Sequence, residues 1–358
     1  MAPLLHGMAG TVTWKSCLDQ PAPWYGSKDA IRVAENVLLY QLSTGGWPKN
    51  IDMATVLSER AKRSLRESKG NPGSTIDNGA TYTQMRFLAR VYAHTNAVRF
   101  ADSFMGGLDY LLRAQLPNGG WPQFYPLVRG YYSHITFNDD AMTGVLNLLL
   151  DISRRAPDFE FVDEVRRQRS ASAVQKGVAC ILKCQIKVDG NLTVWCAQHD
   201  ERDFSPAKAR SYELPSLSGA ESVGIVEFLM RFDTPDLGIV NSVQSAVHWF
   251  DRVQLKGIKV SRVVDSLSPR GVNRVVGKDP DAPPVWARFY EIGSNRPFFC
   301  SRDGIKRYCL SEISSERRNH YNWLGYWPER LLRDEYPRWQ KKWSPGDNVL
   351  EHRKGEAG

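Results

Sequence analysis

Four segments of the chain share one pattern and decide the fold: VLLYQLSTGGWPKN (37–50), YLLRAQLPNGGWPQF (110–124), ILKCQIKVDGNLTVW (181–195) and WFDRVQLKGIKV (249–260). Each segment reads as the apolar end of a helix, followed by a glutamine and a turn that contains glycine. The glutamines are residues 41, 115, 185 and 254, so their spacings are 74, 70 and 69 residues. A nearly fixed period of this kind indicates a repeated supersecondary unit.

Amphipathic helices are predicted between these segments. Apolar residues recur at positions i, i+3, i+4 and i+7 from Met85, from Met142 and from Ile225. Polar residues that can start a helix precede each of them: Asp77-Asn78, Asn138-Asp139-Asp140, and Ser218 with Glu221 three residues later. The repeated unit is therefore an outer helix, a loop and an inner helix, and such pairs bury their apolar faces by closing into a ring.

The predicted fold class is mainly α: an α/α toroid of about three repeated helix pairs, followed by an irregular C-terminal portion with short strands. The texture changes near residue 259, where turn signals and prolines accumulate and VWARFYEI (285–292) reads as a strand. The predicted segments are an N-terminal segment (1–27), the toroid (28–258), a portion that completes the cleft (259–342) and a loose tail (343–358).

Three long loops, at about residues 45–76, 119–138 and 190–217, would open at one end of such a ring. We expect Asp77, Asp139 and Arg210 to converge there, although they are far apart in sequence.

The composition restricts the class of partner. Lys and Arg total 47 and Asp and Glu total 39, which gives a net charge of +8. That surplus favours an anionic partner such as nucleic acid, a membrane surface or an acidic polysaccharide. The chain lacks the dense basic tract of a dedicated nucleic-acid binder, and no run approaches the ~18 apolar residues of a membrane span. We therefore expect that the protein binds neither nucleic acid nor membrane. We also expect a monomer.

The chain starts MAPLLHGMAGTVTWKS, without a basic segment followed by an apolar one, so we predict no signal peptide in it. Six cysteines are too few for a disulfide scaffold of this length. Cys180 and Cys184 lie four residues apart on an apolar helical stretch, where core packing is expected in preference to a metal pair.

Several polar residues are candidates for chemistry. Asp77 and Asp139 could be helix caps, oxygen ligands of calcium with Asn78 nearby, or the acid and base of a hydrolase. Lys208 and Arg210 lie in a loop that is too polar to be core. Either Arg296 or Arg302, each beside a turn, could be a site residue or a surface charge. The tryptophan of each GGWP motif could be a packed plug or a sugar platform. No phosphate-binding loop, dinucleotide fingerprint, HExxH or G-x-S-x-G motif is present.

Six motifs give the chain a recognisable family resemblance. They are GGWPKN, STIDNGATYTQMRFLARVY, GGWPQFYP, HITFNDDAM, HDERDFSPAKARSYELPSLSG and NRPFFCSRDG. In this order they resemble the motif set of the family 10 pectate lyases, over about residues 28–330. The resemblance implies an α/α fold with the active site in a cleft, and calcium-dependent cleavage of polygalacturonate by anti β-elimination, which yields 4,5-unsaturated oligogalacturonides. It also implies secretion or a periplasmic location. The predicted lack of an export signal in this chain differs from that pattern.

The resemblance also assigns roles to individual residues. It implies that Asp77, with Asn78 beside it, and Asp139 hold Ca²⁺. It places the catalytic arginine on Arg210 and a substrate-carboxylate arginine on Arg296, with Arg302 nearby. It assigns no firm role to Lys208, which is the alternative base because a neutral arginine is rare.

The residues also leave two other functions open. One is a glycoside hydrolase on the same toroid, with Asp139 and a second carboxylate as acid and base, which would need no calcium. The other is a non-catalytic protein that binds acidic glycans in the cleft.

Overall fold

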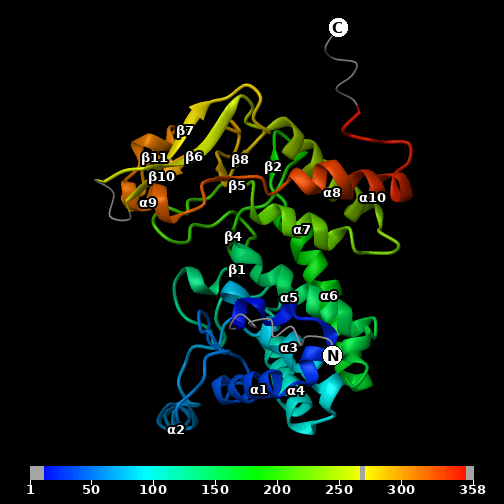
Figure 1. Ribbon diagram of the computed structural model, residues 1–358. Helices are drawn as coiled ribbons and strands as arrows, with labels where there is room; N and C mark the ends of the chain where they lie inside the picture. The colour runs from blue at the N-terminus through cyan, green and yellow to red at the C-terminus, as the bar shows by residue number, and fades with distance from the viewer. Residues whose placement is uncertain (1–11, 267–270, 352–358) are drawn as a thin grey trace, which may run out of the picture. The chain divides into compact units, whose positions relative to one another are not determined.

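The structure is a computed structural model that describes residues 12–266 and 271–351, and it is shown in Figure 1. Residues 1–11 belong to the segment in which we predict no signal peptide, and they lie outside the described residues. Residues 352–358 of the predicted loose tail also lie outside them. In the described part of the chain, no helix has the length and apolar character needed to cross a membrane.

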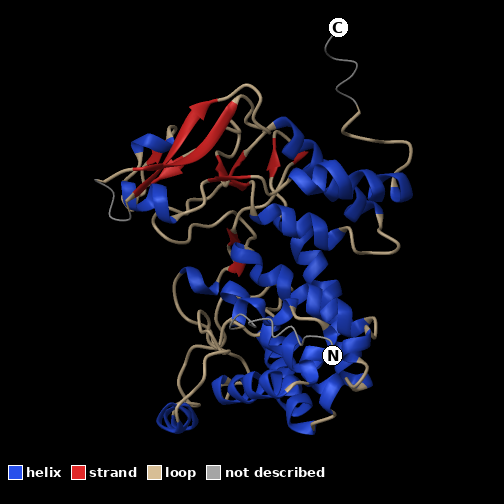
Figure 2. Ribbon diagram, viewed as in Figure 1, coloured by secondary structure: helices blue, strands red, loops and turns tan. Residues whose placement is uncertain are grey.

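Helices form most of the regular structure, as Figure 2 shows. The α-helices are α1 (Lys28–Tyr40), α2 (Glu59–Glu67), α3 (Tyr82–Thr95), α4 (Val98–Ala114), α5 (Ala141–Ser153), α6 (Glu164–Cys184), α7 (Glu221–Leu229), α8 (Leu237–Arg252), α9 (Ser315–His320) and α10 (Tyr336–Trp343). Shorter turns are η1 (Trp14–Asp19), η2 (Ala22–Gly26), η3 (Asp77–Gly79), η4 (Tyr131–Ser133), η5 (Asn138–Asp140), η6 (Pro157–Phe159), η7 (Leu310–Glu312) and the π turn η8 (Leu331–Glu335). The predicted mainly α fold class is confirmed.

The strands within the described residues pair in six antiparallel two-stranded ladders. They are β1 (Ile135–Thr136), β2 (Lys187–Val188), β3 (Asn191–Leu192), β4 (Gln198–His199), β5 (Leu217–Ser218), β6 (Ile258–Val264), β7 (Val272–Lys278), β8 (Trp286–Ala287), β9 (Phe289–Tyr290), β10 (Phe299–Cys300), β11 (Lys306–Arg307) and β12 (Leu324–Gly325). The pairs are β1–β4, β2–β3, β5–β9, β6–β7, β8–β12 and β10–β11.

The chain forms two compact units that alternate along the sequence. The first comprises residues 1–115, 123–128 and 144–174, and the second comprises residues 116–122, 129–143 and 175–358. The segment boundaries that were predicted from changes in sequence composition and pattern remain predictions. Each unit is described by itself below.

In the first unit, α1, α3 and α4 pack against one another. The repeat of apolar residues on α3 places Met85, Leu88 and Ala89 in the core, where all three are fully buried. The predicted loop at residues 45–76 contains α2, which sequence reasoning did not foresee. Its sequence ERAKRSLRE buries no side chain, so a core-facing apolar stripe could not have revealed it.

In the second unit, α7 packs against α8, and the long hairpin β6–β7 packs against α9. The segment predicted as one strand, residues 285–292, is interrupted at Arg288. Its first half, β8, pairs with β12, and its second half, β9, pairs with β5. The interruption occurs at the only charged side chain of the VWARFY run, and this residue belongs to the site described below.

The glutamines of the first three repeats make the same type of contact. Gln41 donates its side-chain amide to the carbonyl of Ser103 on α4 at 2.8 Å. Gln115 donates to Ala173 on α6 at 2.9 Å, and Gln185 donates to Ser242 on α8 at 3.0 Å. Each glutamine follows one outer helix and binds a backbone carbonyl of the next outer helix. The period found in the sequence is therefore a structural repeat.

The tryptophans of the repeats are packed side chains and not exposed sugar platforms. Trp47, Trp121 and Trp195 are fully buried. The indole nitrogens of Trp47 and Trp195 donate to the carbonyls of Val37 and Ile181, both at 2.8 Å. All six cysteines are free, and Cys180 and Cys184 are buried as predicted for core residues.

Candidate active site

Asp77 lies in the first unit, in the turn η3, and it is an unusual aspartate. It is only 3% exposed, and its Oδ2 atom forms an ion pair with Lys49. Its Oδ1 atom is buried and has no hydrogen-bond partner among the described residues. The residue that precedes α3 is Thr81, so Asp77 does not cap this helix. A buried acceptor without a partner costs about 1–3 kcal/mol, which is the behaviour expected of an atom kept for a ligand.

Asn78 follows with φ of 52°, in the left-handed region, and this geometry turns the backbone sharply after Asp77. Its side-chain amide donates to Oδ1 of Asn50 at 2.9 Å. Lys49, Asn50 and Asn78 border a cavity of about 530 Å³ in the first unit. Asn78 therefore lies beside open space, whereas Asp77 is buried next to it in the chain, and their carboxylate and amide oxygens are hard ligands of the kind that calcium prefers.

Asp139 lies in the second unit, in the turn η5, and it is part of a charged group that the sequence did not reveal. Its Oδ1 atom accepts a hydrogen bond from Nη2 of Arg288 at 3.2 Å. Its Oδ2 atom accepts from Asn138 at 2.7 Å. The same Nη2 of Arg288 also binds Oε1 of Glu221, whose other oxygen binds Ser218.

The charges of this group shift the pKa of Arg288 and the pKa of the neighbouring Asp140. Burial raises the pKa of Asp140, and the charges of Glu221 and Asp139 raise it further, to about 6. Burial lowers the pKa of Arg288, but the charge of Glu221, together with Tyr321 and Asp139, outweighs it, so this pKa lies above its ordinary value. Arg288 therefore remains a cation that holds Asp139 and Glu221 together.

Arg210 lies in the second unit and is held by Glu213. Its Nε atom donates to Oε2 of Glu213 at 2.8 Å, and its Nη2 atom donates to Oε1 at 2.5 Å. Burial lowers the pKa of Arg210, but the hydrogen bonds and the charge of Glu213 outweigh it, so this pKa lies above its ordinary value. Cationic neighbours would favour a neutral Arg210, and the structure instead places the anion Glu213 against it.

A second arginine from the predicted set lies near Arg210. The guanidinium carbon of Arg210 is 5.0 Å from the ring centre of Tyr212, and that of Arg302 is 5.6 Å from the same ring. Arg317 on α9 is 4.5 Å from that ring centre. The structure thus gathers three cations around one tyrosine, and Glu316 binds both Arg302 and Arg317.

Arg296 and Lys208 are placed differently. Arg296 is exposed and lies over the ring of Tyr308, at 3.4 Å from its centre, and none of its contacts with described residues involves Tyr212. Lys208 is exposed in the loop two residues before Arg210, and it forms no ion pair within the described ranges. The structure therefore brings Arg302, and not Arg296, to the tyrosine that Arg210 contacts.

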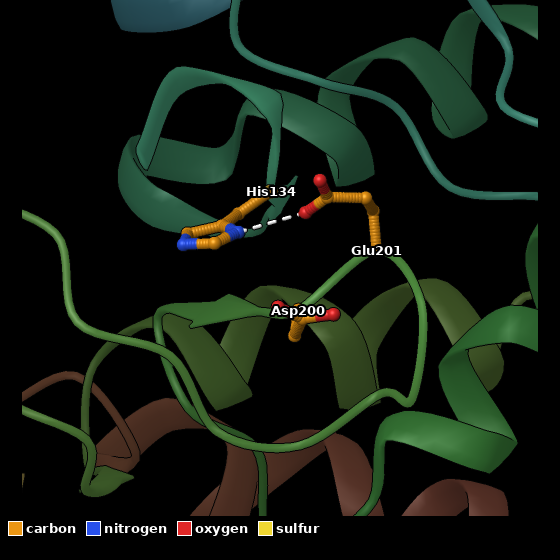
Figure 3. A group of neighbouring side chains, drawn as sticks. All are labelled: His134, Asp200 and Glu201. Carbon is orange, nitrogen blue, oxygen red and sulfur yellow. Dashed lines mark hydrogen bonds and ion pairs between the residues drawn. The ribbon is translucent and has the colours of Figure 1, made fainter. Parts of the chain in front are cut away.

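A separate cluster of possible metal ligands lies at one end of the β1–β4 ladder, as Figure 3 shows. The register pairs Ile135 with His199, so the flanking residues His134 and Asp200 lie next to this pair. One ligand atom from each of His134, Asp200 and Glu201 lies within 4.8 Å of the others. Nδ1 of His134 is 2.9 Å from Oε2 of Glu201, so a hydrogen bond already joins two of the three.

The predicted site residues thus fall into two sets. Asp77 and Asn78 belong to the first unit, whereas Asp139, Lys208, Arg210, Arg296 and Arg302 belong to the second. Sequence reasoning missed Arg288 and Glu221, which lie beside Asp139, and it missed Glu213 as the partner of Arg210. A signal existed for Arg288, because a lone charge within the apolar run VWARFY is expensive to bury without a partner.

Known proteins that resemble the chain fall in one family. Residues 41–332 match the family model described as pectic acid lyase. A solved family 10 polysaccharide lyase from Cellvibrio cellulosa is 38% identical, with a TM-score of 0.77 over 88% of this chain and 94% of that one. A mutant of a family 10 polysaccharide lyase from Cellvibrio cellulosa, in complex with trigalacturonic acid, is 37% identical, with a TM-score of 0.77 over 92% and 99%. No curated protein matches the chain.

The mainly helical fold and these matches define the class of the protein, which is a polysaccharide lyase. The chain belongs to the pectic acid lyase family, and its resemblance to the family 10 lyases is confirmed.

Proposed function

We propose that the chain cleaves α-1,4-linked polygalacturonate by calcium-assisted anti β-elimination and releases 4,5-unsaturated oligogalacturonides. The pectate lyase activity follows from the family and from the similarity to solved family 10 lyases. The substrate is supported by the neighbour whose structure contains trigalacturonic acid. The observation that carries the proposal for this chain is the group of arginines around Tyr212 in the second unit, and the buried, unpartnered carboxylate oxygen of Asp77 in the first unit supports it separately.

Asp77 and Asp139 are the residues that would hold calcium, with Asn78 beside the first. Asp77 fits because its Oδ1 atom is buried without a partner, and the donors are oxygens. Asp139 fits because its side chain is partly exposed, so that a metal ion can reach its carboxylate oxygens. When bound, calcium would neutralise charge on the uronate carboxylate and so make the adjacent C5 proton more acidic.

The reaction needs a cation on the substrate carboxylate and a base at C5. We propose that Arg302 takes the carboxylate, because it lies at the ring of Tyr212 that Arg210 also contacts. A guanidinium can bind both oxygens of a carboxylate in a fork, and it would stabilise the charge that develops there. Arg296, which the sequence analysis favoured, is the alternative for this role.

We propose Arg210 as the base. A nitrogen of its side chain in the neutral guanidine form takes the C5 proton, the electrons of the C5–H bond form the C4–C5 double bond, and the C4–O bond breaks. The departing oxygen leaves with that bonding pair and is protonated by water. Because Glu213 raises the pKa of Arg210, the neutral form is rare and the rate should increase in alkaline solution. Lys208, in the same loop, is the alternative base.

One experiment tests the function. The purified protein is incubated with polygalacturonate, with calcium or with excess chelator after exhaustive removal of metal, and near-ultraviolet absorbance is followed. We expect absorbance from the unsaturated uronide with calcium and none with chelator. Reducing ends without absorbance would indicate a hydrolase, and binding without either signal would indicate a non-catalytic glycan binder. Absorbance that is fully retained in chelator would contradict the calcium requirement.

The remaining parts of the proposal concern the protein as a whole. We propose secretion, because the family acts on an extracellular polysaccharide. We also propose a monomer that binds neither nucleic acid nor membrane, and light scattering after size exclusion would measure its mass directly.

A further inference from the structure

The guanidinium of Arg210 is fixed by one neighbouring carboxylate. In addition to the two side-chain bonds, the backbone N–H of Arg210 donates to Oε2 of Glu213 at 3.2 Å. The backbone N–H of Glu213 donates to the carbonyl of Arg210 at 2.9 Å, which closes a tight turn. The turn and the forked pair restrain the same side chain, so Arg210 has little freedom to rotate.

Glu213 is in turn held by a residue far away in sequence. The hydroxyl of Tyr321 donates to Oε1 of Glu213 at 2.8 Å, across 108 residues of chain. Both residues are buried, and the Tyr321 ring packs edge-on against Tyr212, with 5.2 Å between ring centres. Tyr321 also lies beneath Arg288, whose guanidinium carbon is 4.9 Å from the ring centre. The side chain of Tyr321 therefore joins the group of Asp139 to the group of Arg210.

An ion pair of this kind, in which only Glu213 is buried, is weak evidence for stability, because desolvation of the charges offsets their attraction. The ion pair does, however, fix the orientation of the Arg210 guanidinium. The pair uses Nε and Nη2 of Arg210, and none of its contacts with the described residues uses Nη1. Arg210 remains partly exposed, with 43% of its side chain accessible. Nη1 is thus the guanidinium nitrogen left available to a substrate.

We propose that Glu213 and Tyr321 are positioning residues, which fix the guanidinium of Arg210 so that Nη1 is presented to the C5 proton. This inference rests on the proposed function, which makes Arg210 the base. Neither residue touches the reacting atoms. Their effect is to hold the base in one orientation, and a displacement of about 1 Å in such a group can cost about 100-fold in rate.

The titratable and charged groups that face Arg210 determine how its protonation depends on pH. These groups are Glu213 and Tyr212 from its own loop, Tyr321, Arg317 on α9 and Tyr131 on η4. Glu213 is the anion among them, because burial raises its pKa but the hydrogen bonds and charge of Arg210 outweigh this and lower it. Removing the charge of Glu213 therefore lowers the pKa of Arg210, and the neutral form becomes accessible at lower pH.

The test is the pH profile of kcat on polygalacturonate, with saturating calcium, for the wild type, Glu213→Gln and Tyr321→Phe. For Glu213→Gln we expect kcat to fall about tenfold to 100-fold, KM to stay within about threefold, and the alkaline rise of kcat to move to lower pH. For Tyr321→Phe we expect a smaller fall in kcat without a shift to lower pH, because the charge of Glu213 remains. Glu329→Gln and Tyr326→Phe are matched exposed controls and should behave as the wild type.

The outcomes separate the two levels of the argument. A wild type that forms no unsaturated product overturns the proposed function and this inference with it. An active wild type whose Glu213→Gln variant keeps kcat within about twofold and its pH profile unchanged overturns the inference alone. If circular dichroism shows that Glu213→Gln does not fold, Tyr321→Phe decides, since it keeps the ring and removes only the hydroxyl. Full activity of that variant would then refute the positioning role.

Discussion

Asp77 shows how a single buried atom separates a structural role from a functional one. A capping aspartate has its oxygens satisfied by backbone N–H groups, whereas Oδ1 of Asp77 has no such partner in the described ranges. Lys49, with 30% of its side chain exposed, balances the charge through the other oxygen. Lys49 therefore balances the negative charge of Asp77 through Oδ2, and Oδ1 is left without a hydrogen-bond partner among the described residues.

Asp77→Ala is expected to lose most activity and to keep its fold. Loss of a cap would cost only about 0.5–2 kcal/mol, and removal of an unsatisfied buried oxygen costs less still. The measurement is the melting temperature with and without calcium, together with the rate. We expect the wild type to melt higher when calcium is added and the variant not to respond. Asp102→Ala, at an exposed position of the same unit, should keep both properties. A variant that is active, or one that unfolds, would show that Asp77 is structural.

Arg302→Ala is expected to reduce kcat/KM by at least about tenfold, because a forked contact with the uronate carboxylate is lost. Arg302→Lys should recover little, since a point charge does not reproduce the fork. Arg296→Ala is the matched comparison. Its guanidinium stacks on Tyr308, so we expect an effect below about threefold from loss of this cation–π contact alone. The reverse ranking of the two alanine variants would restore the assignment made from the sequence.

At this scale the sequence predicted the residue types of the site better than their partners. Asp139 and Arg210 were predicted because each lies in a motif that can be read locally. Arg288 contacts Asp139 across 149 residues and Glu221 across 67. Such contacts arise only when the chain has folded, and no spacing rule connects these positions.

The repeat glutamines are the clearest feature at the scale of helices and loops. The side-chain amides of Gln41, Gln115 and Gln185 each join the end of one outer helix to the backbone of the next. Gln254 follows the last outer helix, α8, and its amide binds Asp251 of the same helix at 2.8 Å. The interhelix contact is thus made where a further outer helix follows and is replaced by a local one where the series ends.

Gln185→Leu is expected to lower the free energy of unfolding by about 1–3 kcal/mol. Leucine has a similar volume, but it leaves the carbonyls of Thr193 and Ser242 without their donor. Urea unfolding followed by circular dichroism measures the effect. Gln168→Leu, at an exposed position of α6, is the control and should change stability by less than about 0.5 kcal/mol. Equal stability of the two variants would show that the repeat contact contributes nothing.

His199 ties the turn after β4 to its surroundings. Its Nε2 atom accepts from the N–H of Cys196 at 3.0 Å, and its Nδ1 atom lies 2.8 Å from the carbonyl of Phe204. This arrangement needs a neutral ring with the proton on Nδ1. Burial lowers the pKa of His199 to about 4. The unfolded chain therefore binds this proton from about pH 6.5 downward, while the folded chain does not.

Compared with His199→Gln, the wild type should lose its stability advantage as pH falls from about 6.5 to 4, by up to about 3 kcal/mol. Asp140, whose raised pKa acts in the opposite sense near pH 6, is present in both proteins and does not enter the difference. Urea unfolding at several pH values measures it. A difference that does not change with pH would show that His199 titrates as in the unfolded chain.

The helices of the fold could be predicted because their apolar periodicity is strong, as on α3 and α5. The helix α2 could not, since its nine residues bury nothing and carry no apolar stripe. The break between β8 and β9 was also missed. A run such as VWARFYEI reads as one strand until the partners of its arginine, Asp139 and the buried Glu221, are known.

The net charge of +8 is a property of the whole molecule and matches a polyanionic substrate. Charges at distances beyond the Debye length, about 10 Å at 0.1 M salt, contribute only in dilute salt. A polymer with many carboxylates samples this wider field, whereas a trimer interacts chiefly with the groups that contact it. The two substrates therefore separate the general attraction from the specific contacts.

With calcium held saturating, kcat/KM for polygalacturonate should fall by about tenfold as salt increases from about 0.05 to 0.5 M. The fall for trigalacturonate should be smaller, because fewer charges are involved. We expect the change in KM and not in kcat, since the field brings substrate to the site but does not act at the C5 proton. Sucrose at matched viscosity controls for diffusion. Equal salt dependence for polymer and trimer would show that the excess charge does not attract the chain, and that the contacts around Tyr212 and Asp139 account for binding on their own.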